Sequence, residues 1–162
     1  MSCAARASPL LKQSLMPNKP SLHYQETDYS CAPACLLMVL DAFGVSRTEA
    51  EIRQDSRCTP DGTKPNDLVE AAKKYGFASS IQEHRQSFNH LRKRLRQGHY
   101  PIVYLGVSLS TDTQSQKHSV VVFEIDRTGV HILDPIRGQL TIPKEVFEKQ
   151  WEDMDRVTIV IS

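Results

Sequence analysis

The longest apolar segment of the chain predicts a buried helix. From Cys31 to Phe43, apolar side chains recur at spacings of three and four residues and also fill much of the remaining circumference. A helix that is apolar nearly all round packs on several sides at the centre of a domain. Ser30 suits its N-cap, Pro33 is tolerated in its first turn, and Gly44 supplies a left-handed stop. The pattern therefore predicts a central helix with these bounds.

Two further helices are predicted between this segment and residue 76. Ser46 and Glu49 are spaced as in a capping box, which predicts a short helix to about Gln54. Residues 64–76 have Pro65 and Asp67 in the first helical turn, two lysines in the last turn and a glycine stop at Gly76. These signals place two helices directly after the central one.

A fourth helix is predicted after Ser87, which suits its N-cap. Its apolar side chains, expected to face inward, are Phe88, Leu91 and Leu95. Its basic side chains, expected to face outward, are Arg92, Lys93, Arg94 and Arg96. A nucleic-acid or substrate patch is the alternative, but no aromatic residues interleave with the cluster. We therefore interpret it as a solvated helix face.

The second half of the chain predicts an antiparallel sheet. Its expected strands cover residues 77–82, 100–105, 117–125, 130–134, 139–142 and 157–161. A short helix over 143–151 should turn Val146, Phe147 and Trp151 inward, with Trp151 in the core rather than in a binding site. Helices first and strands second indicate an α+β domain in which a helical half packs on the sheet. The groove between the halves is then the expected site for an extended peptide.

One predicted hairpin carries candidate chemistry at both of its ends. His118 opens its first strand and Asp134 closes its second, with a turn at residues 126–129. An odd number of loop residues would put the two side chains on one face of the sheet, and a two-residue loop would put them on opposite faces. Gly129 suits the positive-φ position of a three-residue loop with a bulge. We therefore expect His118 and Asp134 to share a face, as a base and its orienter do.

Cys31 is the candidate nucleophile. The partial positive charge at a helix N-terminus favours its thiolate, whereas Cys35, one turn later, fits ordinary packing. Gln25 lies six residues upstream in a polar run, where its amide could donate a hydrogen bond beside the sulfur. Together with the backbone N–H of Cys31 it would form a two-donor oxyanion hole. Thiol, base, orienter and amide together predict acyl-transfer chemistry.

These residues resemble the bacteriocin-processing, or double-glycine, cysteine peptidase family. That family has a Gln, a Cys six residues later, a second Cys at plus four and an apolar helix that ends in Gly. Its second block has a His that opens an apolar strand and an Asp-Pro after the next strand. The matching residues are Gln25, Cys31, Cys35, Gly44, His118, Asp134 and Pro135. The chain departs from the motif at residues 30–32, which read Ser-Cys-Ala where many members have Asp-Cys-Gly.

The resemblance runs from about Tyr24 to the C-terminus. It implies a papain-like cysteine peptidase domain over residues 24–162. Residues 1–23 contain three prolines and no acidic residue, which predicts an irregular lead-in. The resemblance also implies that Cys31 is the nucleophile, His118 the general base and acid, Asp134 the orienter and Gln25 the oxyanion donor. The implied substrate is a protein or peptide, cut after small residues such as a Gly-Gly pair, and no cofactor is expected. Nothing in the sequence resembles the membrane span or P-loop of the peptide-exporting transporters to which such domains often belong.

Composition narrows the choice of partner and compartment. A length of 162 residues suits one domain, and a net charge of +1 gives no electrostatic case for nucleic acid or an anionic membrane. The four cysteines lack a disulfide framework and a second metal-ligand pair, so we expect reduced thiols and no metal. The first 23 residues hold no signal-peptide core. The expected location is the cytoplasm, or the cytoplasm of a target cell into which the protein is delivered.

Alternative functions use the same four residues. A deamidase or transglutaminase would act on a side-chain acyl group, and a binding module would keep the fold without the chemistry. An interbacterial effector toxin would use the peptidase chemistry on a target-cell protein and be silenced by an immunity partner. The polar loop over residues 106–117 is a candidate lid beside His118. The other histidines, interpreted as surface or incidental, are His23, His84, His90, His99 and His131.

Overall fold

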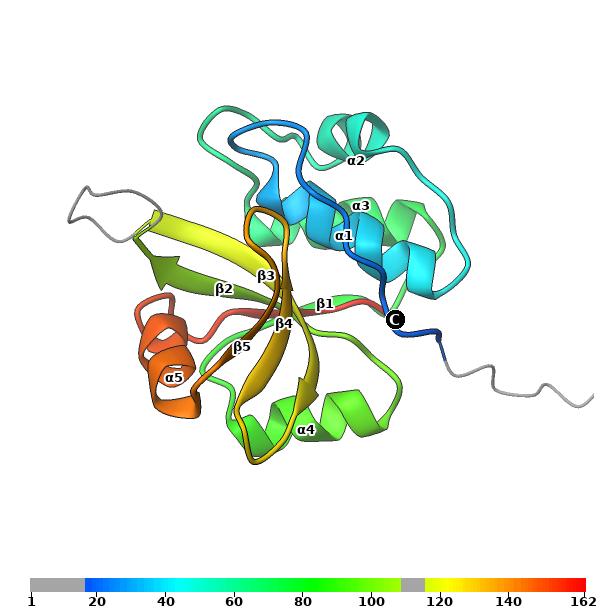
Figure 1. The fold of residues 1–162 in the computed structure, drawn as a ribbon. Coiled ribbons are helices and arrows are strands. Elements are labelled where there is room, and N and C mark those ends of the chain that lie inside the picture. The colour runs from blue at the N-terminus through cyan, green and yellow to red at the C-terminus, as the bar shows by residue number, and fades with distance from the viewer. Residues whose placement is uncertain (1–16, 109–115) are drawn as a thin grey trace, which may run out of the picture.

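A six-stranded antiparallel sheet lies between two groups of helices in the computed structural model, which describes residues 17–108 and 116–162 (Figure 1). The elements are α1 (Cys31–Ala42), α2 (Glu49–Asp55), α3 (Pro65–Lys74), β1 (Ile81–Glu83), α4 (Phe88–Arg96), β2 (Ile102–Val107), β3 (Gln116–Ile125), β4 (Val130–Asp134), β5 (Gly138–Ile142), α5 (Lys144–Glu152) and β6 (Thr158–Val160). The strand order is β1-β6-β2-β3-β4-β5. The predicted α+β class, with a helical half on an antiparallel sheet, is confirmed.

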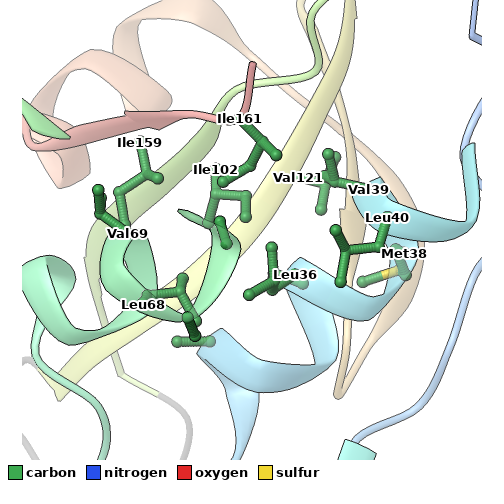
Figure 2. Packing of buried hydrophobic residues seen from close by; sticks show 14 of the residues in the cluster. Leu36, Met38, Val39, Leu40, Leu68, Val69, Ile102, Val121, Ile159 and Ile161 are labelled. Carbon is green, nitrogen blue, oxygen red and sulfur yellow. The ribbon is translucent and has the colours of Figure 1, made fainter. Parts of the chain in front are cut away.

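Apolar packing fills both faces of the sheet. On one face, side chains of α1 and α3 meet β2, β3 and β6, with Leu36, Val121 and Ile159 among those fully buried (Figure 2). On the other face, α4 and α5 cover a second cluster that includes Phe147 and Trp151. The sequence predicted that helices pack on one face of the sheet. The other face is covered by α4 and α5. In the described part of the chain no helix has the length and apolar character needed to cross a membrane.

Helix α1 is the central helix that the apolar pattern predicts. Nine of its twelve residues are buried, and Gly44 has the expected positive φ of 78°. Ser30 occupies the N-cap position, but its hydroxyl makes no capping bond. Instead, Ser30 Oγ accepts the Thr27 N–H at 3.1 Å and donates to the Thr27 carbonyl at 3.3 Å. No side-chain cap therefore occupies the amide groups at the start of α1, where Cys31 stands.

The predicted capping box of α2 is displaced by two residues. Thr48, not Ser46, is the N-cap: its Oγ accepts the Glu51 N–H at 3.1 Å, and Glu51 Oε2 accepts the Thr48 N–H at 2.8 Å. The sequence contains this Ser/Thr-x-x-Glu spacing twice, so the local pattern does not select the register. In the observed register the side chain of Glu49 is fully buried. The two possible N-caps, Ser46 and Thr48, are equally good locally. The helix that starts after Thr48 is the one in which Glu49 makes its tertiary contacts.

His118 and Asp134 share a face for a reason other than the one predicted. Residues 126–129 form a four-residue, even-numbered loop, because Ile125 pairs with Val130. The register of β3 against β4 shifts between Val122 and Glu124, leaving one extra residue in β3. This bulge changes the parity, so Asp134 falls level with a residue two positions from His118. The expected outcome is right, and the expected odd loop is wrong.

Smaller differences concern exposed positions. Val146 is 46% exposed, against the prediction that it faces inward, because α5 needs only Phe147 and Trp151 to cover the sheet. The first strand begins at Ile81 rather than residue 77, since residues 77–80 turn back on α3. In α4, Arg94 folds back to pair with Glu83 at 2.6 Å instead of facing solvent freely. The candidate lid falls mainly on residues 109–115, which lie outside the described residues.

Candidate active site

A cavity of about 350 Å³ opens beside the first residue of α1. Its walls come from residues 25–32, the loop over 60–63 and the start of β3, together with Tyr104 of β2 and Ile136, which follows β4. Gln25, Cys31 and His118 all line it. Asp134 does not line the cavity but contacts His118 from behind. The structure thus brings together the four residues predicted from the sequence.

His118 and Asp134 form a buried ion pair. The distance between His118 Nε2 and Asp134 Oδ1 is 2.8 Å, and both side chains are almost fully buried. Asp134 Oδ1 also accepts the backbone N–H of Ile136 at 2.8 Å, and Oδ2 accepts Arg137 Nε at 2.7 Å. Burial alone would raise the pKa of Asp134, but its bonds with His118, Ile136 and Arg137 hold that pKa well below the usual range. The carboxylate is therefore ionised and fixed.

Cys31 and His118 interact as a nucleophile and a base would. Burial alone would raise the pKa of Cys31, but hydrogen bonds with His118 and Ser119, and the imidazole charge, lower it. Burial alone would lower the pKa of His118, whereas hydrogen bonds with Asp134 and Cys31 raise it to about 9. Since Nε2 is bonded to Asp134, Nδ1 is the nitrogen left to face the sulfur. The geometry favours a thiolate–imidazolium pair near neutral pH.

This pair predicts a bell-shaped dependence of kcat/KM on pH. Activity should rise as Cys31 loses its proton, below the usual thiol range because its pKa is lowered. It should fall near pH 9 as His118 loses its proton, because the pKa of His118 is raised to about 9. Initial rates measured across the pH range in one ionic strength would check both limbs. A rate that kept rising beyond pH 10, with no alkaline limb, would contradict the ion pair.

Gln25 is held from two sides. Its side-chain Nε2 donates to the Thr27 carbonyl at 2.7 Å, and its backbone N–H donates to the carbonyl of Pro135, the residue after Asp134, at 2.9 Å. An amide nitrogen has two hydrogens, so a second donor remains on the cavity wall. The buried Oε1 atom of Gln25 accepts no hydrogen bond from any residue that the structure describes. This arrangement suits an oxyanion donor beside Cys31.

Several residues around the site were not singled out from the sequence. Ser119, next to His118, lies close to Cys31, and its backbone N–H lowers the pKa of the thiol. Arg137 clamps Asp134, and Lys117 Nζ lies 3.4 Å from the Thr63 carbonyl on the cavity wall. The spacing of Arg137 three residues after Asp134 is a usable sequence signal. Ser119 carried no signal beyond adjacency to His118.

Among the thiols and histidines that the structure describes, those that line the cavity are Cys31 and His118. Cys35 is fully buried, and burial raises the pKa of its thiol, as the packing interpretation predicts. Some histidines are not merely incidental, because they pair with carboxylates. These pairs are His23 with Glu49, His84 with Asp155, His90 with Glu83, and His131 with Asp126. Sequence spacing did not reveal them, since each partner is brought close by folding or by a turn.

Among residues 17–108 and 116–162, two groups of side chains have atoms close enough to hold a metal ion. They are His23, Glu26 and Glu49, and Glu124, Asp126 and His131. In the first group both oxygens of Glu49 already accept a backbone N–H, and in the second Asp126 already accepts hydrogen bonds from Thr128 and His131. Neither group lines the cavity beside Cys31. The chemistry of the cavity is therefore that of a thiol and an imidazole.

Comparisons with known proteins show the family of the chain. A model of the Peptidase C39 family matches residues 19–161. An uncharacterized protein of Methanothermobacter thermautotrophicus is 32% identical over 125 residues, covering 77% of this chain and 78% of that protein. The lactococcin-G-processing and transport ATP-binding protein LagD of Lactococcus lactis is 25% identical over 128 residues, covering 79% of this chain but 17% of LagD.

Solved structures confirm the papain-like fold predicted from the sequence. A putative C39-like peptidase from Bacillus anthracis superposes with a TM-score of 0.73 at 18% identity, covering 88% of this chain and 94% of that chain. The peptidase domain of Streptococcus ComA gives 0.68 at 23% identity, with 89% and 98% covered. A double glycine motif protease from an AMS/PCAT transporter, solved with its leader peptide, gives 0.65 at 20% identity, with 90% and 94% covered.

Proposed function

This chain belongs to the Peptidase C39 family and is a cysteine peptidase, and we propose that its catalytic triad is Cys31, His118 and Asp134. The observation that carries this proposal is the meeting of three groups at one cavity. A thiol of lowered pKa lies at the start of α1, beside an imidazole that a buried carboxylate orients. These are the geometric roles of a nucleophile, its base and the orienter of that base.

Peptide hydrolysis follows from this arrangement in two stages. The Cys31 thiolate attacks the scissile carbonyl carbon, and the oxyanion accepts hydrogen bonds from Gln25 Nε2 and the Cys31 N–H. The His118 imidazolium then gives its proton to the leaving amine, and a thioester to Cys31 remains. His118, now neutral, takes a proton from water, whose oxygen attacks the thioester. The acid product leaves and the ion pair is restored.

Replacing Gln25 with alanine should lower kcat by about a hundredfold to a thousandfold, as loss of one oxyanion donor typically does. Alkylation of Cys31 by iodoacetamide forms no oxyanion, so its rate should stay unchanged and serves as the internal control. Steady-state hydrolysis and alkylation rates, measured on the same preparations, give both numbers. A Gln25→Ala protein that keeps kcat within about threefold of the unchanged chain would remove Gln25 from the mechanism.

We also propose cleavage after small residues such as a Gly-Gly pair. Support comes from the family and from two relatives, one named for lactococcin-G processing and one a double glycine motif protease solved with a leader peptide. The cavity volume is at the low end of ligand sites, which favours a chain with small side chains beside Cys31. New chain ends preceded by Gly-Gly, mapped by mass spectrometry, would support this specificity. Cleavage after bulky residues would overturn it.

Deamidation and transamidation would use the same residues on a glutamine side chain. The two outcomes differ in mass, because deamidation converts Gln to Glu without a new chain end. The Cys31→Ala protein, used to capture substrates from a lysate, would supply the target on which to make this measurement. A new chain end in the captured target, produced by the unchanged protein, supports the peptidase. A glutamate at a former glutamine, with the chain intact, would contradict it.

A further inference from the structure

A buried carboxylate lies directly behind the segment that carries Gln25. The Glu49 side chain, at the first position of α2, is fully buried. Its two oxygens accept the backbone N–H of Glu26, both at 3.1 Å, and Oε2 lies 2.9 Å from His23 Nε2. The guanidinium nitrogen Nε of Arg53 lies 3.8 Å from Oε1. A buried carboxylate is costly unless its oxygens are bonded, so these contacts fix its place.

Residues 23–26, here called the strap, are held on one side by Glu49 and on the other by the sheet. Gln25 stands between the two attachments, because its own N–H donates to the Pro135 carbonyl at 2.9 Å while the next N–H binds Glu49. The strap has no helix or strand hydrogen bonds of its own. The backbone position of Gln25 therefore depends on these two attachments.

We propose that Glu49 is a positioning residue that holds Gln25 where its amide can stabilise the oxyanion. This inference rests on the proposed role of Gln25 and adds a residue that does not touch the substrate. Without the carboxylate, the Glu26 N–H would lose its acceptor, and the strap would shift to find another. A displacement of about 1 Å in a catalytic group can cost up to about a hundredfold in rate. His118 and Ser119, which lie beside Cys31, would keep their positions.

The test compares two reactions of Cys31 on the whole 162-residue chain. In acylation by p-nitrophenyl acetate, an S–C bond forms, the C–O bond breaks and p-nitrophenolate leaves with the electron pair, through an oxyanion. In alkylation by iodoacetamide, sulfur displaces iodide without an oxyanion. Mass spectrometry of the peptides assigns each product to Cys31 rather than to Cys3 or Cys58. Neither reagent requires the natural substrate.

Glu49→Ala should slow acylation by about tenfold or more and leave alkylation of Cys31 unchanged. In a Gln25→Ala background, Glu49→Ala should not slow acylation further, because the Gln25 amide through which Glu49 acts is absent. Glu49→Gln keeps a carbonyl oxygen for the Glu26 N–H and should restore most of the rate. Glu51→Ala is the matched control: it removes the other carboxylate of the α2 cap, does not touch the strap, and should leave acylation unchanged.

Cys35 reports folding in every variant, because it is fully buried and reacts with iodoacetamide only when the chain opens. If Cys35 becomes reactive in Glu49→Ala, the test uses Glu49→Asp in place of Glu49→Ala. The shorter aspartate side chain keeps the carboxylate but withdraws it from the strap. Three results would each overturn the inference. The first is that Glu49→Ala slows acylation and alkylation equally. The others are that its effect adds to that of Gln25→Ala, or that Glu51→Ala slows acylation as much as Glu49→Ala does. An unchanged chain whose Cys31 reacts with neither reagent would instead overturn the proposed function, and the inference with it.

Discussion

Replacing Cys31 with alanine should lower peptide hydrolysis by at least about ten-thousandfold, because no other described residue that lines the cavity carries a thiol to form the thioester. The expected effect is on kcat rather than on binding, since the substituted side chain is small and the cavity walls stay in place. Turnover of a quenched fluorescent peptide that contains Gly-Gly, followed over hours, gives the dynamic range needed.

Cys58→Ala is the matched control for this prediction. Cys58 is a second partly exposed thiol, whose sulfur lies 3.8 Å from the carbonyl of Tyr29, on the loop side of the same region. Burial raises the pKa of Cys58, whereas the pKa of Cys31 is lowered, so only Cys31 is activated. Full activity in Cys58→Ala with none in Cys31→Ala supports the assignment. The reverse result would assign the nucleophile to Cys58.

Replacing Asp134 with asparagine should lower kcat by about a thousandfold to ten-thousandfold, the range seen when a triad carboxylate becomes an amide. The carboxylate bond raises the pKa of His118 to about 9, against a burial effect that lowers it. Without the charge, His118 loses its proton at lower pH, so the alkaline limb of the pH profile should move down. The combination of a lower kcat and a displaced limb is what identifies an orienter.

Asp126→Asn provides the matched control in the same hairpin. Asp126 pairs with His131 at 2.8 Å, at the far end of the strands that carry His118 and Asp134. The substitution removes a histidine–carboxylate pair of the same kind from an exposed turn, away from the cavity. Both kcat and the alkaline limb should be unchanged in it. An equal loss of activity in Asp126→Asn would mean that hairpin stability, not orientation of His118, explains the effect of Asp134→Asn.

The parts of the fold that were predictable are those with a local cause. The helix after Cys31 is fixed by its apolar pattern and by Gly44, and the strands that carry His118 and Asp134 are fixed by alternation and turn residues. Each of these signals lies within a few residues of the feature it determines. The same holds for the N-cap at Ser87, whose hydroxyl accepts the His90 N–H.

The parts that were not predictable depend on partners distant in sequence. The bulge between Val122 and Glu124, which puts His118 and Asp134 on one face, leaves no signal of its own in an apolar strand. The register of α2 depends on whether Glu49 finds hydrogen-bond donors, and those come from residues 23 and 26. In both cases several local arrangements cost about the same, and long-range contacts select one of them.

The most direct test of the account is the detection of the acyl-enzyme. A peptide that contains Gly-Gly, or its ester, is mixed with the protein, quenched in acid within the first turnover, and the protein is digested and weighed by mass spectrometry. We expect the N-terminal product to be attached to Cys31 as a thioester, and the adduct to be absent from Cys31→Ala. Cleavage that proceeds at the full rate without an adduct on Cys31, and that persists in Cys31→Ala, would contradict this expectation.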